Sequence, residues 1–147
     1  MRRFLAVLGL SLSIALGASL GPAPAWAGAD IVARVDLSSQ KMKVYVDGRP
    51  RYNWKVSTAG AGYSTPLGSY RPTRMHRMWH SRKYDLAPMP NSIFFRGGYA
   101  IHGTPHVRSL GRRASHGCVR LAPGNARTLY RLIAQRGMGN SRIVITH

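Results

Sequence analysis

The sequence predicts a mainly β domain, built like a β-sandwich, with one helix near its C-terminus. Three observations favour this fold class. Short apolar segments, several of them alternating with polar residues, dominate the chain, and signals for tight turns separate them. Helical spacing of apolar residues is confined to one late stretch.

The first 27 residues have the pattern of a secretory signal peptide. Arg2 and Arg3 supply positive charge, residues 4–20 are uncharged and mostly apolar, and Ala25-Trp26-Ala27 places small residues at a cleavage site after Ala27. An uncleaved membrane anchor is the alternative, because the run is near the lower length limit for spanning a bilayer. Its interruption by glycine and the small-residue site favour cleavage. We therefore expect a signal peptide over residues 1–27, one compact domain over residues 28–147, and export to the periplasm or cell envelope.

Residues 28–147 are strongly basic. Only Arg2 and Arg3 leave with the leader, so 20 Lys and Arg remain against four Asp and no Glu, a net charge of +16. This balance predicts salt-sensitive adhesion to anionic envelope surfaces. The arginines form no concentrated arm and no nucleic-acid motif, so we expect no nucleic acid as partner. A solvated surface that keeps the protein soluble explains most of them equally well.

The mature chain opens with strand signals. Ile31–Leu37 and Lys41–Val46 alternate, Asp47-Gly48 is a hairpin turn signal, and a third strand follows over Arg49–Thr58. These segments predict an antiparallel sheet. Turn residues then surround a short strand within Thr65–Pro72, to which we give a structural role.

The segment Arg74–Phe95 is rich in methionine and aromatic residues, which suit either the core or the wall of a substrate cleft. Within it, Tyr84–Pro90 is too loop-like to be wholly buried and is a candidate lid beside a site. His76 and His80 are four residues apart, but no carboxylate or cysteine nearby completes a metal-ligand set.

The remaining elements follow the same pattern. Ser92–Phe95 and Tyr99–His102 are predicted strands joined by a glycine pair. Apolar spacing predicts a helix from Pro123 to Arg136, and Gly137 supplies its stop. Ile143–Ile145 is a closing buried strand.

Cys118 is the chain's one cysteine, so it has no intramolecular disulfide partner. A thiol becomes a good nucleophile when an imidazole takes its proton. His102 and His116 both lie close in sequence, and their spacing does not settle which is the base. With carboxylates so scarce, a backbone carbonyl, that of Gly103, is the expected group that orients the imidazole of His102.

The residues His102-Gly103-Thr104, followed after residue 114 by Ser115–Arg120 (SHGCVR), resemble the active-site signature of the L,D-transpeptidase (YkuD-type) catalytic domain family. This family cross-links or decorates peptidoglycan. The resemblance covers most of the chain from about Ile31 to Thr146. Arg120 stands where many members carry asparagine.

The resemblance implies roles for the residues of the two blocks other than Val119. Cys118 attacks the donor stem peptide and His102 is the usual base. Backbone N–H groups of the turn around Gly117 are placed to hold the oxyanion. The other expected roles are His116 as a second catalytic histidine, Ser115 and Gly117 as turn and oxyanion residues, and Gly103, Thr104 and Arg120 as substrate contacts.

By the same resemblance, the donor is a tetrapeptide stem with a terminal D-alanine that is released as an acyl-thioester forms. The acceptor is open: another stem, a protein lysine such as that of an outer-membrane lipoprotein, a free D-amino acid or water. No cofactor or metal is expected, and the protein is expected to be a monomer.

Two other classes of function remain open, and a third is disfavoured. A zinc hydrolase using His102, His116 and Cys118 is disfavoured because two ligands are separated by a single residue and no glutamate base exists. A non-enzymatic cationic envelope protein needs only the positive charge. Paired-carboxylate glycosidase chemistry is disfavoured by the few acidic residues.

Overall fold

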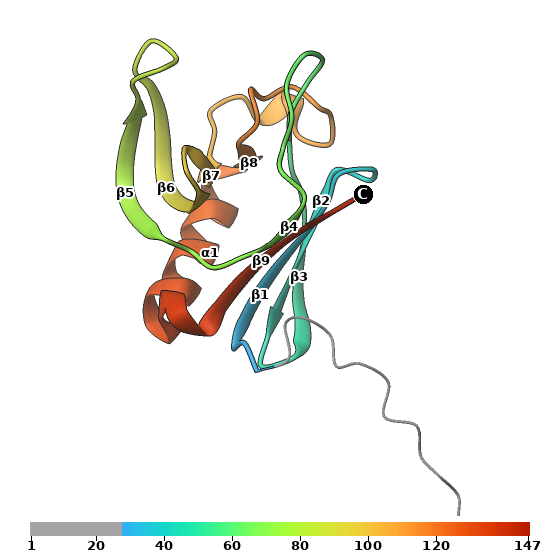
Figure 1. Ribbon diagram of the computed structural model, residues 1–147, viewed down its shortest axis with the longest axis vertical. Helices are drawn as coiled ribbons and strands as arrows, with labels where there is room; N and C mark the ends of the chain where they lie inside the picture. The colour runs from blue at the N-terminus through green and yellow to red at the C-terminus, as the bar shows by residue number, and fades with distance from the viewer. Residues whose placement is uncertain (1–27) are drawn as a thin grey trace, which may run out of the picture.

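A computed structural model describes residues 28–147 and shows two β-sheets with one α-helix packed against them (Figure 1). The expected signal peptide, residues 1–27, lies outside the described residues. Within residues 28–147, no helix combines the length and apolar character needed to cross a membrane. The elements are β1 (Ile31–Asp36), β2 (Lys41–Val46), β3 (Arg49–Lys55), β4 (Gly68–Tyr70), β5 (Arg74–Ser81), β6 (Ala87–Arg96), β7 (Tyr99–Gly103), η1 (Val107–Ser109), β8 (Val119–Leu121), α1 (Pro123–Arg136), η2 (Met138–Asn140) and β9 (Ser141–Thr146).

The first sheet has five strands in the order β3-β2-β1-β9-β4. The predicted antiparallel opening of β1, β2 and β3 is confirmed, and β9 closes the sheet parallel to β1. The third strand ends at Lys55 rather than at Thr58, because the chain then leaves β2 for the second sheet. Ser57 exchanges two backbone hydrogen bonds with Arg120. The Gln40 side chain donates to Thr58 Oγ1 and accepts the Thr58 N–H.

The second sheet has four strands in the order β5-β6-β7-β8, with β7 and β8 parallel. β6 begins at Ala87, so the predicted loop through Pro90 is shorter than expected. Pro88 and Pro90 pair with β5, whereas β7 pairs with β6 only from Ile93 onward. The two prolines therefore lie where one side of β6 has no neighbouring strand, which tolerates a missing N–H.

The helix α1 has the predicted bounds. Pro123 is its first residue, and Gly137 follows its end at φ 91° and donates its N–H to the Ile133 carbonyl at 2.8 Å. Its buried face, Ala126, Leu129 and Ile133, joins the main core. The helix packs against β6 and β7 of the second sheet.

Successive side chains of β7 and β8 point to opposite faces of the second sheet, and one of these faces is the core. Ile101, Val119 and Leu121 are completely buried in the main core, which fills the space between the sheets and α1. The intervening residues face the opposite side, because successive side chains of a strand alternate. His102 lies opposite Arg120 in the register. A well-packed core therefore holds this pair of strands from behind.

Replacing Ile143 by alanine tests the role of β9 in holding the two sheets together. Ile143 is completely buried in the main core, which contains residues of both sheets, so we expect a loss of about 2–5 kcal/mol in the free energy of unfolding by denaturant. Val107→Ala, at a side chain that is 48% exposed, is the control and is expected to change stability by less than about 1 kcal/mol. Equal effects of the two substitutions would contradict this account of the core.

Candidate active site

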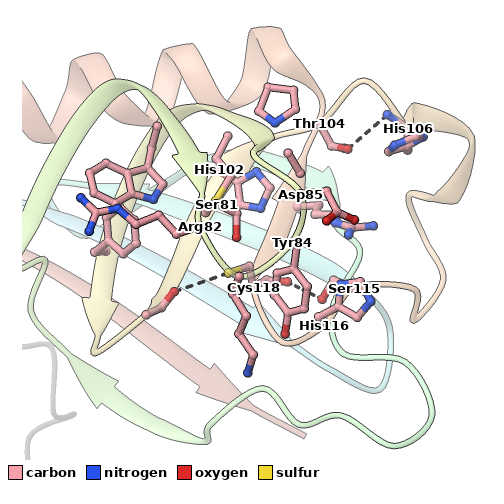
Figure 2. A pocket seen from close by; sticks show the side chains of 18 of the residues that line it. Ser81, Arg82, Tyr84, Asp85, His102, Thr104, His106, Ser115, His116 and Cys118 are labelled. Carbon is pink, nitrogen blue, oxygen red and sulfur yellow. Dashed lines mark hydrogen bonds between the residues drawn. The ribbon is translucent and has the colours of Figure 1, made fainter.

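A cavity of about 920 Å³ opens on the face of the second sheet that is turned away from the core (Figure 2). Side chains from β5, the β5–β6 turn, β6, β7 and the turn before β8 line it. One wall is apolar and consists of Trp79, Met89 and Phe94. The charged lining residues are Arg74, Arg82, Lys83, Asp85 and Arg120.

The cavity brings His102 and Cys118 together from neighbouring strands. His102 is on β7, and Cys118 immediately precedes β8, one register position before the Ile101–Val119 pair. This places Cys118 beside Ala100, and the two residues share a small apolar cluster with Met89 and Phe94. Figure 2 shows the His102 ring turned toward the Cys118 thiol.

The predicted orientation of His102 by a backbone carbonyl is confirmed. The ring is only 6% exposed, and its Nδ1 lies 2.7 Å from the Gly103 carbonyl oxygen. Because a carbonyl only accepts, Nδ1 carries the hydrogen and Nε2 keeps its lone pair. Burial lowers the pKa of His102 to about 4, helped by the charge of Arg120 and opposed by the Gly103 hydrogen bond. The imidazole is therefore neutral at pH 7.

Cys118 is a partly buried thiol whose Sγ lies 3.8 Å from the Gly98 carbonyl oxygen. Burial raises the pKa of this thiol above its ordinary value, whereas a backbone hydrogen bond from Ala100 and the charge of Arg120 act in the opposite direction. The resting pair at neutral pH is thus a neutral thiol beside a neutral imidazole. Such a pair needs proton transfer during attack rather than before it.

Two hydroxyl groups hold the turn that presents the thiol. Ser115 Oγ donates to the Cys118 carbonyl at 2.6 Å and accepts the Gly117 N–H at 3.0 Å. Thr65 Oγ1 donates to the Gly117 carbonyl at 2.8 Å and accepts the Ala59 N–H at 3.1 Å. No local sequence pattern connects Thr65 with this turn, because 52 residues separate it from Gly117.

These bonds correct the expected oxyanion site. The N–H of Gly117 already donates to Ser115 Oγ, so this N–H is not available to hold an oxyanion of the substrate. In the described part of the chain, the N–H groups of His116 and Cys118 have no backbone partner. They are the donors that the turn leaves available.

The turn also requires a glycine at position 117. Gly117 has φ +128°, and a Cβ there would lie 2.6 Å from Cε1 of Tyr99 and 2.9 Å from the backbone oxygen of Ser64. Both contacts are closer than a real Cβ allows, and the backbone conformation is one that other residues rarely adopt.

The three expected substrate contacts are placed differently from one another. Gly103 does not line the cavity, because it is buried between Pro90 and Ala126, and its carbonyl serves His102 instead. Thr104 is buried at the cavity wall, where its Oγ1 accepts the N–H of His106 at 3.1 Å. Arg120 lines the cavity and also donates to the Ala114 carbonyl at 3.2 Å, so it supports the turn as well.

His116 is exposed and lies between two tyrosines rather than against the thiol. Its ring stacks on Tyr84 at 4.3 Å and 15° and meets the edge of Tyr63 at 4.6 Å. Tyr84 belongs to the β5–β6 turn, so the predicted lid segment does border the cavity. The sequence pattern did not single out Tyr63, because nothing local connects it to the motif.

The zinc hydrolase, disfavoured from the sequence, would need a cluster of metal-binding side chains. Among residues 28–147, no three His, Cys, Asp or Glu side chains lie close enough together to hold a metal ion.

Comparisons with known proteins give a consistent result. Residues 30–145 match the L,D-transpeptidase catalytic domain. No curated protein matches the chain. Similar solved structures include an L,D-transpeptidase from Mycobacterium smegmatis, with TM-score 0.71 and 22% identity over 82% of this chain and 60% of that one. Another, from Stackebrandtia nassauensis, has TM-score 0.68 and 27% identity over 80% of this chain and 56% of that one.

A third is L,D-transpeptidase 3 from Mycobacterium tuberculosis in complex with a faropenem-derived adduct, with TM-score 0.70 and 19% identity over 82% of this chain and 61% of that one. The chain thus spans about 60% of the length of the first solved structure. The family match covers most of the chain and coincides with the folded domain. The chain therefore belongs to the L,D-transpeptidase (YkuD-type) catalytic domain family.

Proposed function

We propose that this protein is a peptidoglycan L,D-transpeptidase that uses Cys118 as its nucleophile and His102 as its base. The observation that carries the proposal is the oriented pair itself. A neutral imidazole, fixed by the Gly103 carbonyl, presents Nε2 on the face where the thiol lies. Membership of the transpeptidase family supplies the reaction class.

The proposed reaction has two halves. In the first, His102 Nε2 accepts the thiol proton while Cys118 Sγ attacks the carbonyl carbon between the third residue of the stem and D-alanine. The C–N bond breaks, D-alanine takes the proton from His102, and an acyl-thioester remains. In the second, an acceptor amine attacks the thioester and loses its proton to His102, the C–S bond breaks, and the thiol is restored.

The lining of the cavity supports a peptide donor with free carboxylates. The cavity lining contains four basic side chains, those of Arg74, Arg82, Lys83 and Arg120, and one acidic side chain, that of Asp85. This excess of positive charge suits the carboxylates of a stem peptide. The N–H groups of His116 and Cys118 are the proposed oxyanion donors. The rings of Tyr63 and Tyr84 hold the His116 ring, and we assign His116 a role in positioning the turn that carries Cys118.

We also propose where the protein acts, which acceptor it uses and in which oligomeric state. The leader over residues 1–27 delivers the domain to the periplasm or cell envelope, where the basic surface meets anionic material. The acceptor is an amine of a second stem, a protein lysine or a D-amino acid, with water as the hydrolytic case. The acting species is a monomer, because one chain supplies the whole pair.

Intact-protein mass spectrometry with purified disaccharide-tetrapeptide tests the proposal. We expect an acyl adduct and released D-alanine with the wild type and neither with Cys118→Ala. Faropenem serves as a second probe, because a related enzyme is known with an adduct derived from it. A folded, reduced wild type that forms no adduct and releases no D-alanine would favour the cationic binding protein instead.

The neutral pair predicts a distinctive pH dependence. Because the pKa of His102 is lowered to about 4, the base stays unprotonated down to about pH 5, and kcat/KM should not fall near pH 6.5. Because the pKa of Cys118 is raised, alkylation by iodoacetamide should keep increasing through about pH 8 and above. An alkylation plateau below neutral pH would instead reveal a thiolate–imidazolium pair.

Gly117→Ala tests the turn, with Gly124→Ala as the matched control. The clash with Tyr99 and with Ser64 should displace the thiol, lowering acylation at least about tenfold and destabilising the fold by about 1–3 kcal/mol. A Cβ at Gly124 meets nothing within 4 Å, so the control should keep full acylation. Unimpaired acylation by Gly117→Ala would contradict the proposed geometry.

A further inference from the structure

A second, smaller cavity of about 300 Å³ lies between α1 and the β5–β6 hairpin and shares no lining residue with the active site. We call it the arginine pocket. Three arginines converge on it, Arg77 from β5 and Arg127 and Arg131 from α1. The remaining lining residues are Asn91, Tyr130, Ala134 and Gln135.

The elements bring these arginines together for simple geometric reasons. Arg127 and Arg131 are four residues apart on α1 and therefore lie on the same face of the helix. Arg77 lies across from Asn91, between the paired positions His76–Ser92 and Met78–Pro90. Like charges at this helical spacing repel one another modestly, and an anion bound between these exposed arginines would relieve that repulsion.

No acidic side chain compensates this charge. The lining contains no carboxylate, and within residues 28–147 the guanidinium groups of the three arginines take part in no ion pair and no side-chain hydrogen bond. The ion pairs of the described residues are those that join Arg136 to Asp30 and Asp47. Among the other aspartates, Asp36 binds its own turn and Asp85 lines the active site.

We propose that the arginine pocket binds the phosphate group of an anionic ligand, independently of the transpeptidase activity. Guanidinium groups present paired donors that match the oxygens of phosphate, and three of them suit an anion with several charged oxygens better than a carboxylate with two. Asn91, Gln135 and Tyr130 add polar side chains that can complete its hydrogen bonds. Either a phospholipid head group or a soluble phosphate ester supplies this chemistry.

Calorimetric titration at fixed ionic strength tests the pocket with inorganic phosphate and with acetate as the carboxylate comparator. The variant Arg127→Ala/Arg131→Ala should lose phosphate affinity about tenfold or more, because two charge-assisted contacts are removed. The matched control, Arg49→Ala/Arg51→Ala on β3, removes the same charge from an exposed strand and should change affinity less than about twofold. Phosphate should also shift the side-chain amide resonances of Asn91 and Gln135.

Cosedimentation with phosphatidylglycerol vesicles then identifies the source of the phosphate. Selective loss of vesicle binding by the pocket variant assigns a lipid head group. Equal vesicle binding by both variants, with inorganic phosphate binding lost only from the pocket variant, assigns a soluble phosphate. Equal weakening of phosphate binding in the two variants, no phosphate binding, or equally tight acetate binding would overturn the proposal.

Discussion

The parallel pairing of β7 with β8 is the constraint on which the site depends. It places His102 and Cys118 on one face of the sheet, while Ile101, Val119 and Leu121 anchor the same two strands in the core from the other face. A side chain on a well-packed strand has little freedom to move away from its partner. The relative placement of His102 and Cys118 is therefore a consequence of core packing, and the loops around the cavity can vary without separating the two residues.

Hydrogen bonding and burial then give this pair its chemical character. The Gly103 carbonyl determines which nitrogen of His102 carries the hydrogen, and burial keeps both the imidazole and the Cys118 thiol uncharged at neutral pH. In the proposed mechanism, charge develops only as the thiol attacks, and the N–H groups of His116 and Cys118 together with Arg120 are the groups proposed to stabilise it. The surrounding basic residues suit an anionic peptide, while the apolar wall of Trp79, Met89 and Phe94 limits solvation of the reacting atoms.

Sequence patterns predicted the parts that local physics controls. The hairpin at Asp47-Gly48, the helix that begins at Pro123 and ends before Gly137, and the carbonyl partner of His102 depend on neighbouring residues, and all three were predicted correctly. Contacts between residues far apart in the chain were not predicted from the sequence. Neither the early end of β3 at Lys55, caused by pairing of Ser57 with Arg120, nor the meeting of Thr65 with Gly117 has a local signal. The engagement of the Gly117 N–H by Ser115 also needs side-chain geometry that spacing does not contain.

The proposed chemistry depends on a His102 that rests neutral, with its hydrogen on Nδ1, beside an uncharged thiol. Nitrogen-15 NMR of labelled histidine in the folded protein measures this directly, because the chemical shifts of the two ring nitrogens report both tautomer and titration. We expect an Nδ1–H tautomer that persists through neutral pH and titrates at a pKa of about 4. A His102 ring that is doubly protonated at pH 7, or that carries its hydrogen on Nε2, would contradict it.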